Sequence, residues 1–447
     1  MNIKKLTATT FVVAASAALT AAVPQISNVT MAQDVTRQVT ISYTLADAPA
    51  VVTVDVQTNN ASGAWASIGG EAVWNATGDV WKKVETGSRT ITWRPDHSWP
   101  DHTIADGGAR AVVTAWALDN TPDYMVVDIT ATGGADTQTY YPAADFVPGG
   151  VTNSLYKTTT LLMRKIMAKD VKWTMGSVAE SGRNATRETP HQVKLDGNYY
   201  IGVYPVTQTQ WQQVTGYNPS YFTTDRMMRP VENVSYTDIR QGKGTVGTAA
   251  SATGGVYPAE QPYGESFLGL LRSKTGIDFD LPSEAQWEFA ARAGNGEGYW
   301  GDGSAMRISS NKDAGLDLLG RYQYNGGKGG ADSATDPAAD CEVTNGTAIV
   351  GSYLPNAWGL YDVHGNVWEF CLDWHEVNIT AYGGAVNIDP SDPAKTLSGA
   401  SGSAHVLRGG SSREEASSCR PAYCISAKPT YRFRNIGFRV LCTAGLR

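Results

Sequence analysis

The chain has 447 residues, a length at which two or three domains are expected. Its formal net charge is −7 and no Lys/Arg-rich run occurs in it, which argues against the basic footprint of a nucleic-acid-binding protein. Only 18% of the residues are charged, while glycine (47) and tryptophan (13) are frequent, and this composition favours a turn-rich, strand-rich globular protein over a helical bundle.

The first 32 residues have the pattern of a secretory signal peptide. Lys4 and Lys5 form a basic start, and the stretch 11–23 is apolar but too short to span a bilayer comfortably. Small residues follow, and Ala32 marks the expected cleavage site. We therefore expect residues 1–32 to be removed, and the mature chain to have no membrane span and to be secreted or periplasmic.

Residues 33–135 are predicted to form an all-β domain. Runs such as "PAVVTVDVQT", "SRTITWRP", "ARAVVTAWAL" and "DYMVVDIT" are typical of strands, and turn-forming residues separate them. Several short strands within about 100 residues favour an immunoglobulin- or fibronectin-like sandwich. No catalytic constellation occurs there. The Gly-, Pro-, Thr- and Ala-rich segment 136–155 is predicted to be a linker, and a second domain is predicted over residues 156–447.

Two segments of the second domain carry the signature of a helix start. In each, a Ser or Thr is followed three residues later by Gln, which forms a capping box, and apolar residues follow at helical spacing. Elsewhere the domain is rich in glycine and aromatic residues, which predicts long ordered loops over a small sheet. The two boxes are Thr207 with Gln210 and Ser283 with Gln286, and Gly216 and Gly294 are expected to end the helices.

The second domain also holds all the cysteines of the chain. In an oxidising compartment disulfides are allowed, and an odd number leaves at least one thiol free or paired with another chain. Two candidate disulfides are Cys419–Cys424 and Cys371–Cys442, but connectivity cannot be read from a sequence. The five are Cys341, Cys371, Cys419, Cys424 and Cys442.

Six blocks of the second domain occur in a fixed order. They are "ETPHQVKLDGNYYIGVYPVTQTQW", "RPVENVSYTDI", "LPSEAQWEFAARAG", "LPNAWGLYDVHGNVWEFCLDW", "VLRGGSS" and "IGFRV". Together they resemble the sulfatase-modifying-factor family, whose namesake is the formylglycine-generating enzyme, over residues 156–447. The resemblance implies an α+β fold of the C-type-lectin-like kind, with a small twisted antiparallel sheet, two helices and much irregular structure.

The resemblance also implies a structural calcium site in "GLYDVHGNVWEF". Carried over by position, its ligands are Asp362, Gly365, Val367 and Glu369. Calcium prefers six to eight oxygen ligands in flexible geometry, and a glycine in a tight loop lets carbonyl groups converge. The alternative is that Glu369 and the tryptophan before it pack and cap the loop. His364, in the same loop, is expected to be exposed.

For activity, the resemblance implies an oxidase that converts a cysteine of a sulfatase peptide to formylglycine, using oxygen and copper(I) held by two cysteines. Two thiolates suit soft Cu(I) if they are accessible and close together. Counted from Ser411, the first cysteine position of the family falls on Glu414 and the second on Cys419. A five-residue insertion after Ser411 would instead make Cys419 and Cys424 the pair. Ser411 and Trp368 match family positions beside and under the oxygen pocket.

Two functions therefore stay open. The first is a formylglycine-generating-type oxidoreductase that acts on a sulfatase or another protein or peptide client, with Cys419 and Cys424 holding copper. The second is a non-catalytic, C-type-lectin-like module that presents residues 408–435 to a ligand. In either case, Arg408, Arg420 and Arg439 are expected to tie loops together rather than to bind a substrate.

Overall fold

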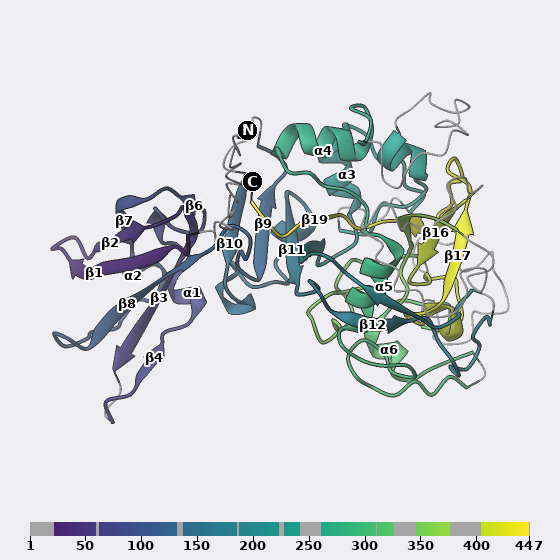
Figure 1. The fold of residues 1–447 in the computed structure, drawn as a ribbon, viewed down its shortest axis with the longest axis horizontal. Helices are drawn as coiled ribbons and strands as arrows, with labels where there is room; N and C mark the ends of the chain where they lie inside the picture. Colours follow the sequence, from purple (N-terminus) through teal and green to yellow (C-terminus); the bar gives the residue numbers. More distant parts are fainter. Residues whose placement is uncertain are drawn as a thin grey trace, which may run out of the picture.

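The computed structural model describes residues 22–59, 62–131, 137–185, 187–222, 228–241, 261–309, 311–325, 346–375 and 404–446. Figure 1 shows the N-terminal strands β1–β8 at the left and a larger part with helices α3–α6 at the right. Within the described ranges, no helix combines the length and the apolar character that crossing a membrane requires.

The N-terminal part consists of two antiparallel sheets. One has the strand order β1-β2-β7-β5, and the other has the order β4-β3-β6 with β8 paired to β3. Two short helices, α1 (Gly70–Val73) and α2 (Pro95–Ser98), join strands of this part. The strands are β1 (Gln25–Gln33), β2 (Val39–Ala46), β3 (Ala50–Asn59), β4 (Trp65–Ser67), β5 (Thr77–Gly78), β6 (Lys83–Val84), β7 (Gly87–Trp93) and β8 (Ala109–Trp116).

Strand β2 shows why the two sheets share one core. Buried and half-buried residues alternate along all of Val39–Ala46, as expected for a strand with one face covered. Ile41 and Tyr43 of β2 lie in the same apolar cluster as Val52 and Val54 of β3 in the other sheet. The predicted all-β character is found in the structure, whereas the likeness to an immunoglobulin or fibronectin domain stays a prediction.

The predicted leader overlaps the first strand. β1 begins at Gln25 and pairs with β2 along its length, and Ile26 and Met31 pack against the core. The boundary expected at residue 32 therefore falls inside a paired strand, and cleavage there would remove all of β1 except its last residue. A leader that leaves this sheet intact has to end before Gln25; residues 1–21 lie outside the described ranges.

The boundary between the two parts also differs from the prediction. β9 (Tyr124–Asp128) and β10 (Gln138–Tyr141) join β11 (Thr160–Ile166) in a five-stranded sheet of the C-terminal part, with the order β10-β9-β11-β14-β19. The segment 124–128 is a strand as predicted, but it belongs to the second domain. The predicted linker 136–155 supplies strand β10, and Tyr140 of this strand is buried. The sequence did not indicate this, because strand propensity does not reveal which sheet a strand will join.

The C-terminal part adds a four-stranded sheet, β17-β16-β15-β18, and a β12-β13 hairpin. Helix α5 packs against β12, β15 and β16 and so links the hairpin to the four-stranded sheet. The remaining elements are β12 (Lys172–Met175), β13 (His191–Lys194), β14 (Tyr199–Gly202), β15 (Trp368–Trp374), β16 (His405–Arg408), β17 (Cys424–Ala427), β18 (Ile436–Gly437), β19 (Leu441–Thr443), α3 (Gln208–Thr215), α4 (Phe267–Thr275), α5 (Glu284–Arg292), α6 (Leu316–Leu319), η1 (Ala144–Phe146), η2 (Ser154–Lys157), the π-helix η3 (Thr237–Gln241) and η7 (Ala416–Cys419).

Both predicted capping boxes are present. Thr207 caps α3 and Ser283 caps α5, each with a reciprocal bond to the Gln at the third helical position. Gly216 ends α3 in the left-handed conformation, whereas Ala293, one residue before the predicted Gly294, takes that conformation at the end of α5. Helix α4 was not predicted, although Ser266 caps it by accepting a hydrogen bond from the backbone N–H of Gly269.

Candidate functional site

The chain makes a sharp turn after β16 that requires glycine. Gly409 and Gly410 have φ angles of 95° and 75°. A Cβ placed on Gly410 would lie 2.6 Å from the Sγ atom of Cys419. The two glycines therefore let the backbone pass directly over Cys419, and Ser411 follows them as a fully buried residue.

Ser411 and Trp368 are brought together by Asn435. The Asn435 side-chain amide donates to the Ser411 hydroxyl at 2.9 Å, and the Trp368 backbone N–H donates to the Asn435 carbonyl at 2.8 Å. The indole N–H of Trp368 donates to Glu414 at 3.1 Å. The residue at the family's first cysteine position is therefore a carboxylate that accepts a hydrogen bond from the tryptophan under the expected oxygen pocket.

The two candidate copper ligands lie in different places. Cys419 ends η7 and packs with Trp300 and Tyr322, whereas Cys424 begins β17 and packs in another apolar cluster with Cys371. Burial raises the pKa of the Cys424 thiol to about 12, and burial followed by the charge of Glu414 raises the pKa of Cys419 as well. Both side chains are therefore protonated at neutral pH, and the structure does not bring them together as a pair of thiolates.

The two disulfides considered from the sequence are not formed. Cys371, Cys419, Cys424 and Cys442 are all buried free thiols. Cys424 has a distant contact of 3.9 Å with the carbonyl of Arg187. Cys341 lies outside the described residues. Sequence spacing suggested Cys419–Cys424, but the first of these residues ends a 3₁₀ turn, the second starts a strand, and they pack in separate apolar clusters.

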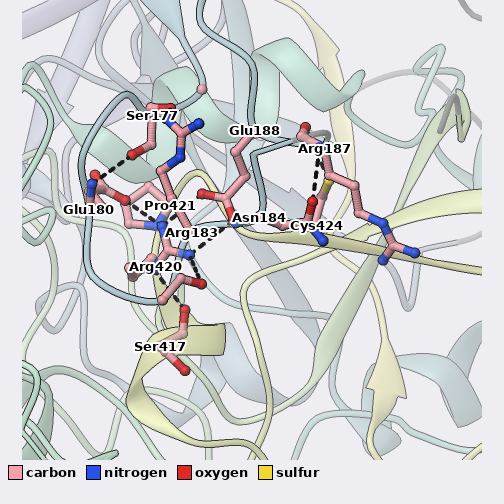
Figure 2. Close-up of polar contacts among 12 residues, drawn as sticks. Ser177, Glu180, Arg183, Asn184, Arg187, Glu188, Ser417, Arg420, Pro421 and Cys424 are labelled. Carbon is pink, nitrogen blue, oxygen red and sulfur yellow. Dashed lines mark hydrogen bonds and ion pairs between the residues drawn. The ribbon is translucent and has the colours of Figure 1, made fainter. Parts of the chain in front are cut away.

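Arg420 ties the 408–435 segment to the loop before β13 (Figure 2). It has no exposed surface, and its guanidinium donates to both oxygens of Glu188 at 2.8 and 2.9 Å and to Glu180 at 2.7 Å. Two further bonds go to the carbonyls of Ser417 and Gly182. Burial alone would lower the pKa of Arg420, but the hydrogen bonds and charges of the two glutamates raise it. The prediction that this arginine connects loops is confirmed.

Arg408 and Arg439 have the same role. Arg408 pairs with Glu284 and Glu288 of α5, at 2.9 and 2.8 Å. Arg439 donates to both oxygens of Glu369, at 2.6 and 2.7 Å, and all three arginines are buried. Each guanidinium meets at least one buried carboxylate, so each is a structural tie between segments far apart in the sequence.

The predicted calcium loop has the expected tight turn, but its glutamate carboxylate is already occupied by protein donors. Gly365 has a φ angle of 100°, and a Cβ there would lie 2.2 Å from the carbonyl of Arg321, so the requirement for glycine is met. Glu369, however, accepts from Arg439 on both oxygens and from the indole of Trp287 at 2.7 Å. A cation in contact with an arginine-paired carboxylate would be repelled. The residues as arranged do not fit a calcium ion bound by Glu369.

The other calcium candidates are also engaged or embedded. Asp362 accepts from the backbone N–H of Gly351 at 2.7 Å and from the amide of Asn366 at 3.1 Å, and burial raises its pKa to about 6. Val367 is fully buried. Within the described ranges, no group of three or more His, Cys, Asp or Glu side chains is arranged to hold a metal ion.

His364 is buried, not exposed as the sequence suggested. One ring nitrogen, Nδ1, lies 3.1 Å from the carbonyl of Cys419, and Nε2 accepts from the backbone N–H of Gly301 at 3.0 Å. Burial lowers the pKa of His364 to about 4, so the ring is neutral and carries its proton on Nδ1. The histidine joins three loops, a role that no spacing pattern in the sequence could have indicated.

Two arginines of the 408–435 segment lie over exposed aromatic rings, one of which belongs to another segment. We call Tyr221, Arg413, Tyr431, Phe433 and Arg434 the Arg/aromatic surface. Tyr221 and Tyr431 are about half exposed. The guanidinium of Arg434 lies 5.1 Å from the Tyr221 ring centre, and that of Arg413 lies 5.6 Å from the Phe433 ring centre. The three aromatic side chains are exposed to solution, unlike the cysteines, and the two arginines beside them are half-buried.

Glu232 lies beneath this surface and is expected to make stability depend on pH. It is fully buried, accepts from the backbone N–H of Phe222 at 2.9 Å, and has its second oxygen without a partner among the described residues. Burial raises its pKa from 4.5 to about 8. The unfolded chain releases this proton near pH 4.5 and the folded chain only near pH 8. The contribution of protonated Glu232 to the free energy of unfolding is therefore full below pH 4.5 and is lost as pH rises to 8.

Glu232→Gln should therefore match the wild type at low pH and exceed it by about 2–4 kcal/mol in free energy of unfolding at pH 8. Urea unfolding at pH 5, 6.5 and 8 measures this. Burial also raises the pKa values of Asp362 and Asp373, to about 6 and about 7. The measured quantity is therefore the difference in free energy of unfolding between variant and wild type at each pH. An equal difference at all three pH values would contradict the assignment.

Comparison with known proteins agrees with the resemblance. A family model described as "Sulfatase-modifying factor enzyme 1-like domain" matches residues 159–444. A formylglycine-generating enzyme of Streptomyces coelicolor is 37% identical over 176 residues, which cover 37% of this chain and 47% of that protein. The corresponding enzyme of Thermomonospora curvata is 36% identical over 149 residues, covering 32% and 40%. The chain thus spans about half the length, or less, of these two relatives.

Other similar proteins have different names. The "Chaperone protein LppX" of Paenibacillus barcinonensis is 30% identical over 188 residues, covering 40% of this chain and 63% of that protein. Among solved structures, Treponema denticola variable protein 1 aligns with a TM-score of 0.43 and 26% identity, covering 64% of this chain and 96% of that chain. PvdO from Pseudomonas aeruginosa aligns with a TM-score of 0.45 and 22% identity, covering 63% and 94%.

Proposed function

The chain belongs to the sulfatase-modifying factor enzyme 1-like family, and we propose that it is a ligand-binding member that does not carry out copper-dependent cysteine oxidation. The placement of the thiols carries the proposal: Cys419 and Cys424 pack in separate apolar clusters, and burial keeps both protonated. Cu(I) held by two cysteines needs adjacent, accessible thiolates. Glu414, at the first cysteine position, offers a hard carboxylate that suits soft Cu(I) poorly.

The proposed ligand face is the Arg/aromatic surface. Arginine and aromatic side chains are the types enriched at the energetic centres of protein interfaces. Their positive charge is complementary to an acidic partner, so the ligand class is an acidic segment of another protein or peptide. An N-terminal leader that ends before Gln25 would place this surface outside the cytoplasm, which is part of the same proposal.

The oxidase alternative can be tested directly, since relatives named formylglycine-generating enzymes give it a basis. Reduced protein carrying Cys341→Ser is titrated with Cu(I) against a competing chelator and then incubated with oxygen and a Cys-x-Pro-x-Arg peptide. We expect no tight copper site and no loss of the peptide thiol, with an active formylglycine-generating enzyme as the positive control. Turnover that both Cys419→Ser and Cys424→Ser abolish would refute the proposal.

Binding is tested by selecting from a random peptide display library on the immobilised protein. Selected peptides should be rich in Asp and Glu, and the combined Arg413→Ala and Arg434→Ala variant should bind them at least about tenfold more weakly. Arg110→Ala, an exposed arginine of the N-terminal part, is the matched control and should leave binding unchanged. Enrichment of uncharged peptides, or equal loss with the control variant, would count against this ligand face.

A further inference from the structure

A concave site lies where the β12-β13 hairpin meets the end of α5. Its volume is about 710 Å³, which is in the range of small-molecule pockets. Trp173, Phe289 and Trp358 are among its walls, with Met167 and Val178 exposed at 56% and 62%. An accessible apolar pocket of this size on a folded chain points to a ligand rather than to a packing defect.

The three aromatic rings of the pocket pack in series, with Phe289 between the two tryptophans. The ring centres of Trp173 and Phe289 are 5.4 Å apart with 49° between their planes. Those of Phe289 and Trp358 are 5.2 Å apart with 64° between their planes. Trp173 and Phe289 are therefore tilted, Phe289 and Trp358 meet nearly edge to face, and all three residues line the pocket. The negative faces of such rings attract cations.

One carboxylate of the pocket has no cationic partner among the described residues. Glu297 accepts hydrogen bonds from the hydroxyl of Ser177 at 2.8 Å and from the backbone N–H groups of Val178, Ala179 and Glu180, and all of these bonds end on Oε1. The donors are neutral groups. Oε2 is left without a protein partner in the described part of the chain, so Glu297 brings a negative charge to the edge of the aromatic wall.

The positive charge of the pocket is already neutralised. Arg292 donates to Glu288 at 2.8 Å and to the carbonyl of Gly176 at 2.9 Å, and it lies 3.8 Å from Glu180. The side-chain amide of Asn295 is likewise engaged by two carbonyls. The pocket therefore combines three aromatic residues with a carboxylate that has no cationic partner among the described residues.

We propose that this pocket binds a free small molecule with a quaternary ammonium group. A quaternary nitrogen has no N–H donors, so it loses no hydrogen bonds when apolar walls replace water, whereas the three N–H donors of a primary ammonium would share the one unpartnered oxygen of Glu297. Aromatic faces and Glu297 together offset the positive charge. The site is independent of the Arg/aromatic surface and of the cysteines, so its test does not depend on the proposed function.

Choline and its uncharged isostere 3,3-dimethylbutan-1-ol are the probes, and the fluorescence of the pocket tryptophans and calorimetric titration are the readouts. We expect saturable binding of choline that is at least about tenfold tighter than that of the isostere, because only choline gains the cation–π and carboxylate attraction. Ethanolamine, the primary-ammonium analogue, should bind more weakly than choline. Equal binding of choline and the isostere, tighter binding of ethanolamine, or no binding of choline in the millimolar range would overturn the proposal.

Two pocket variants locate the binding. Glu297→Gln keeps an oxygen for the backbone N–H groups and removes the charge, so choline affinity should fall about tenfold while binding of the isostere is unchanged. Trp358→Leu keeps an apolar wall and removes a ring, and it should weaken choline more than the isostere. Glu265→Gln, an exposed carboxylate outside the pocket, is the matched control. A loss that this control reproduces would contradict the assignment of the site.

Discussion

Replacing Arg420 with methionine is expected to lower the free energy of unfolding by about 3–5 kcal/mol, because buried Glu188 loses its cation and buried Glu180 keeps only Arg292, at 3.8 Å. Glu180 and Glu188 contact the guanidinium through three bonds of 2.7–2.9 Å, and all three side chains are at most 1% exposed. A charge buried without a partner costs far more than an exposed one. Urea unfolding of wild type and variant measures the loss.

The cause of that loss can be separated from lost packing. If unpaired charge is responsible, adding Glu180→Gln and Glu188→Gln to Arg420→Met should restore much of the stability, because the remaining groups are neutral. Arg413→Met, a partly exposed arginine of the same segment, is the control and should cost under about 1 kcal/mol. A loss from Arg420→Met as small as that of the control, or one that the two glutamines leave unchanged, would show that the network does not hold the segment.

The sequence predicted the local structure around this network but not the network itself. Capping boxes such as Ser283 with Gln286 are local patterns, because a helix start is specified by residues a few positions apart. The partners of Arg420 are more than 230 positions away in the chain. Nothing in local composition marks which glutamate an arginine will meet, so the sequence supported only the general expectation that these arginines tie loops together.

The same limit explains the errors at the candidate site. A C-x4-C spacing predicts proximity only if the backbone between the cysteines folds back, and here Cys419 ends a 3₁₀ turn while Cys424 starts a strand. Tyr140 was assigned to a linker because Gly and Pro surround it, although it anchors a strand in the five-stranded sheet. Family motifs identified the domain correctly, whereas the chemistry of the site depends on side-chain contacts that those motifs do not specify.

Arg439→Met is expected to destabilise the protein by a similar amount, about 3–5 kcal/mol, because buried Glu369 would lose its cation and keep only the hydrogen bond from the Trp287 indole. Arg439 also donates to the carbonyls of Gly202 and Tyr361, at 3.0 Å each, so its removal leaves those acceptors unpaired too. Thermal unfolding of wild type, Arg439→Met and the combined variant with Glu369→Gln measures the effect. The combined variant should recover part of the loss, since no charge is then left unpaired.

The same residues also allow a test of whether Glu369 pairs with Arg439 or binds the calcium ion that the sequence suggested. If Arg439 neutralises Glu369, EDTA should leave the melting temperature of the wild type unchanged, and added calcium should not raise it, because no carboxylate oxygen of Glu369 is free. Glu369→Gln gives the complementary check, since its loss of stability should be the same with and without EDTA. If EDTA lowers the melting temperature of the wild type and Glu369→Gln removes that sensitivity, Glu369 binds a metal and the ion pair is not its main interaction.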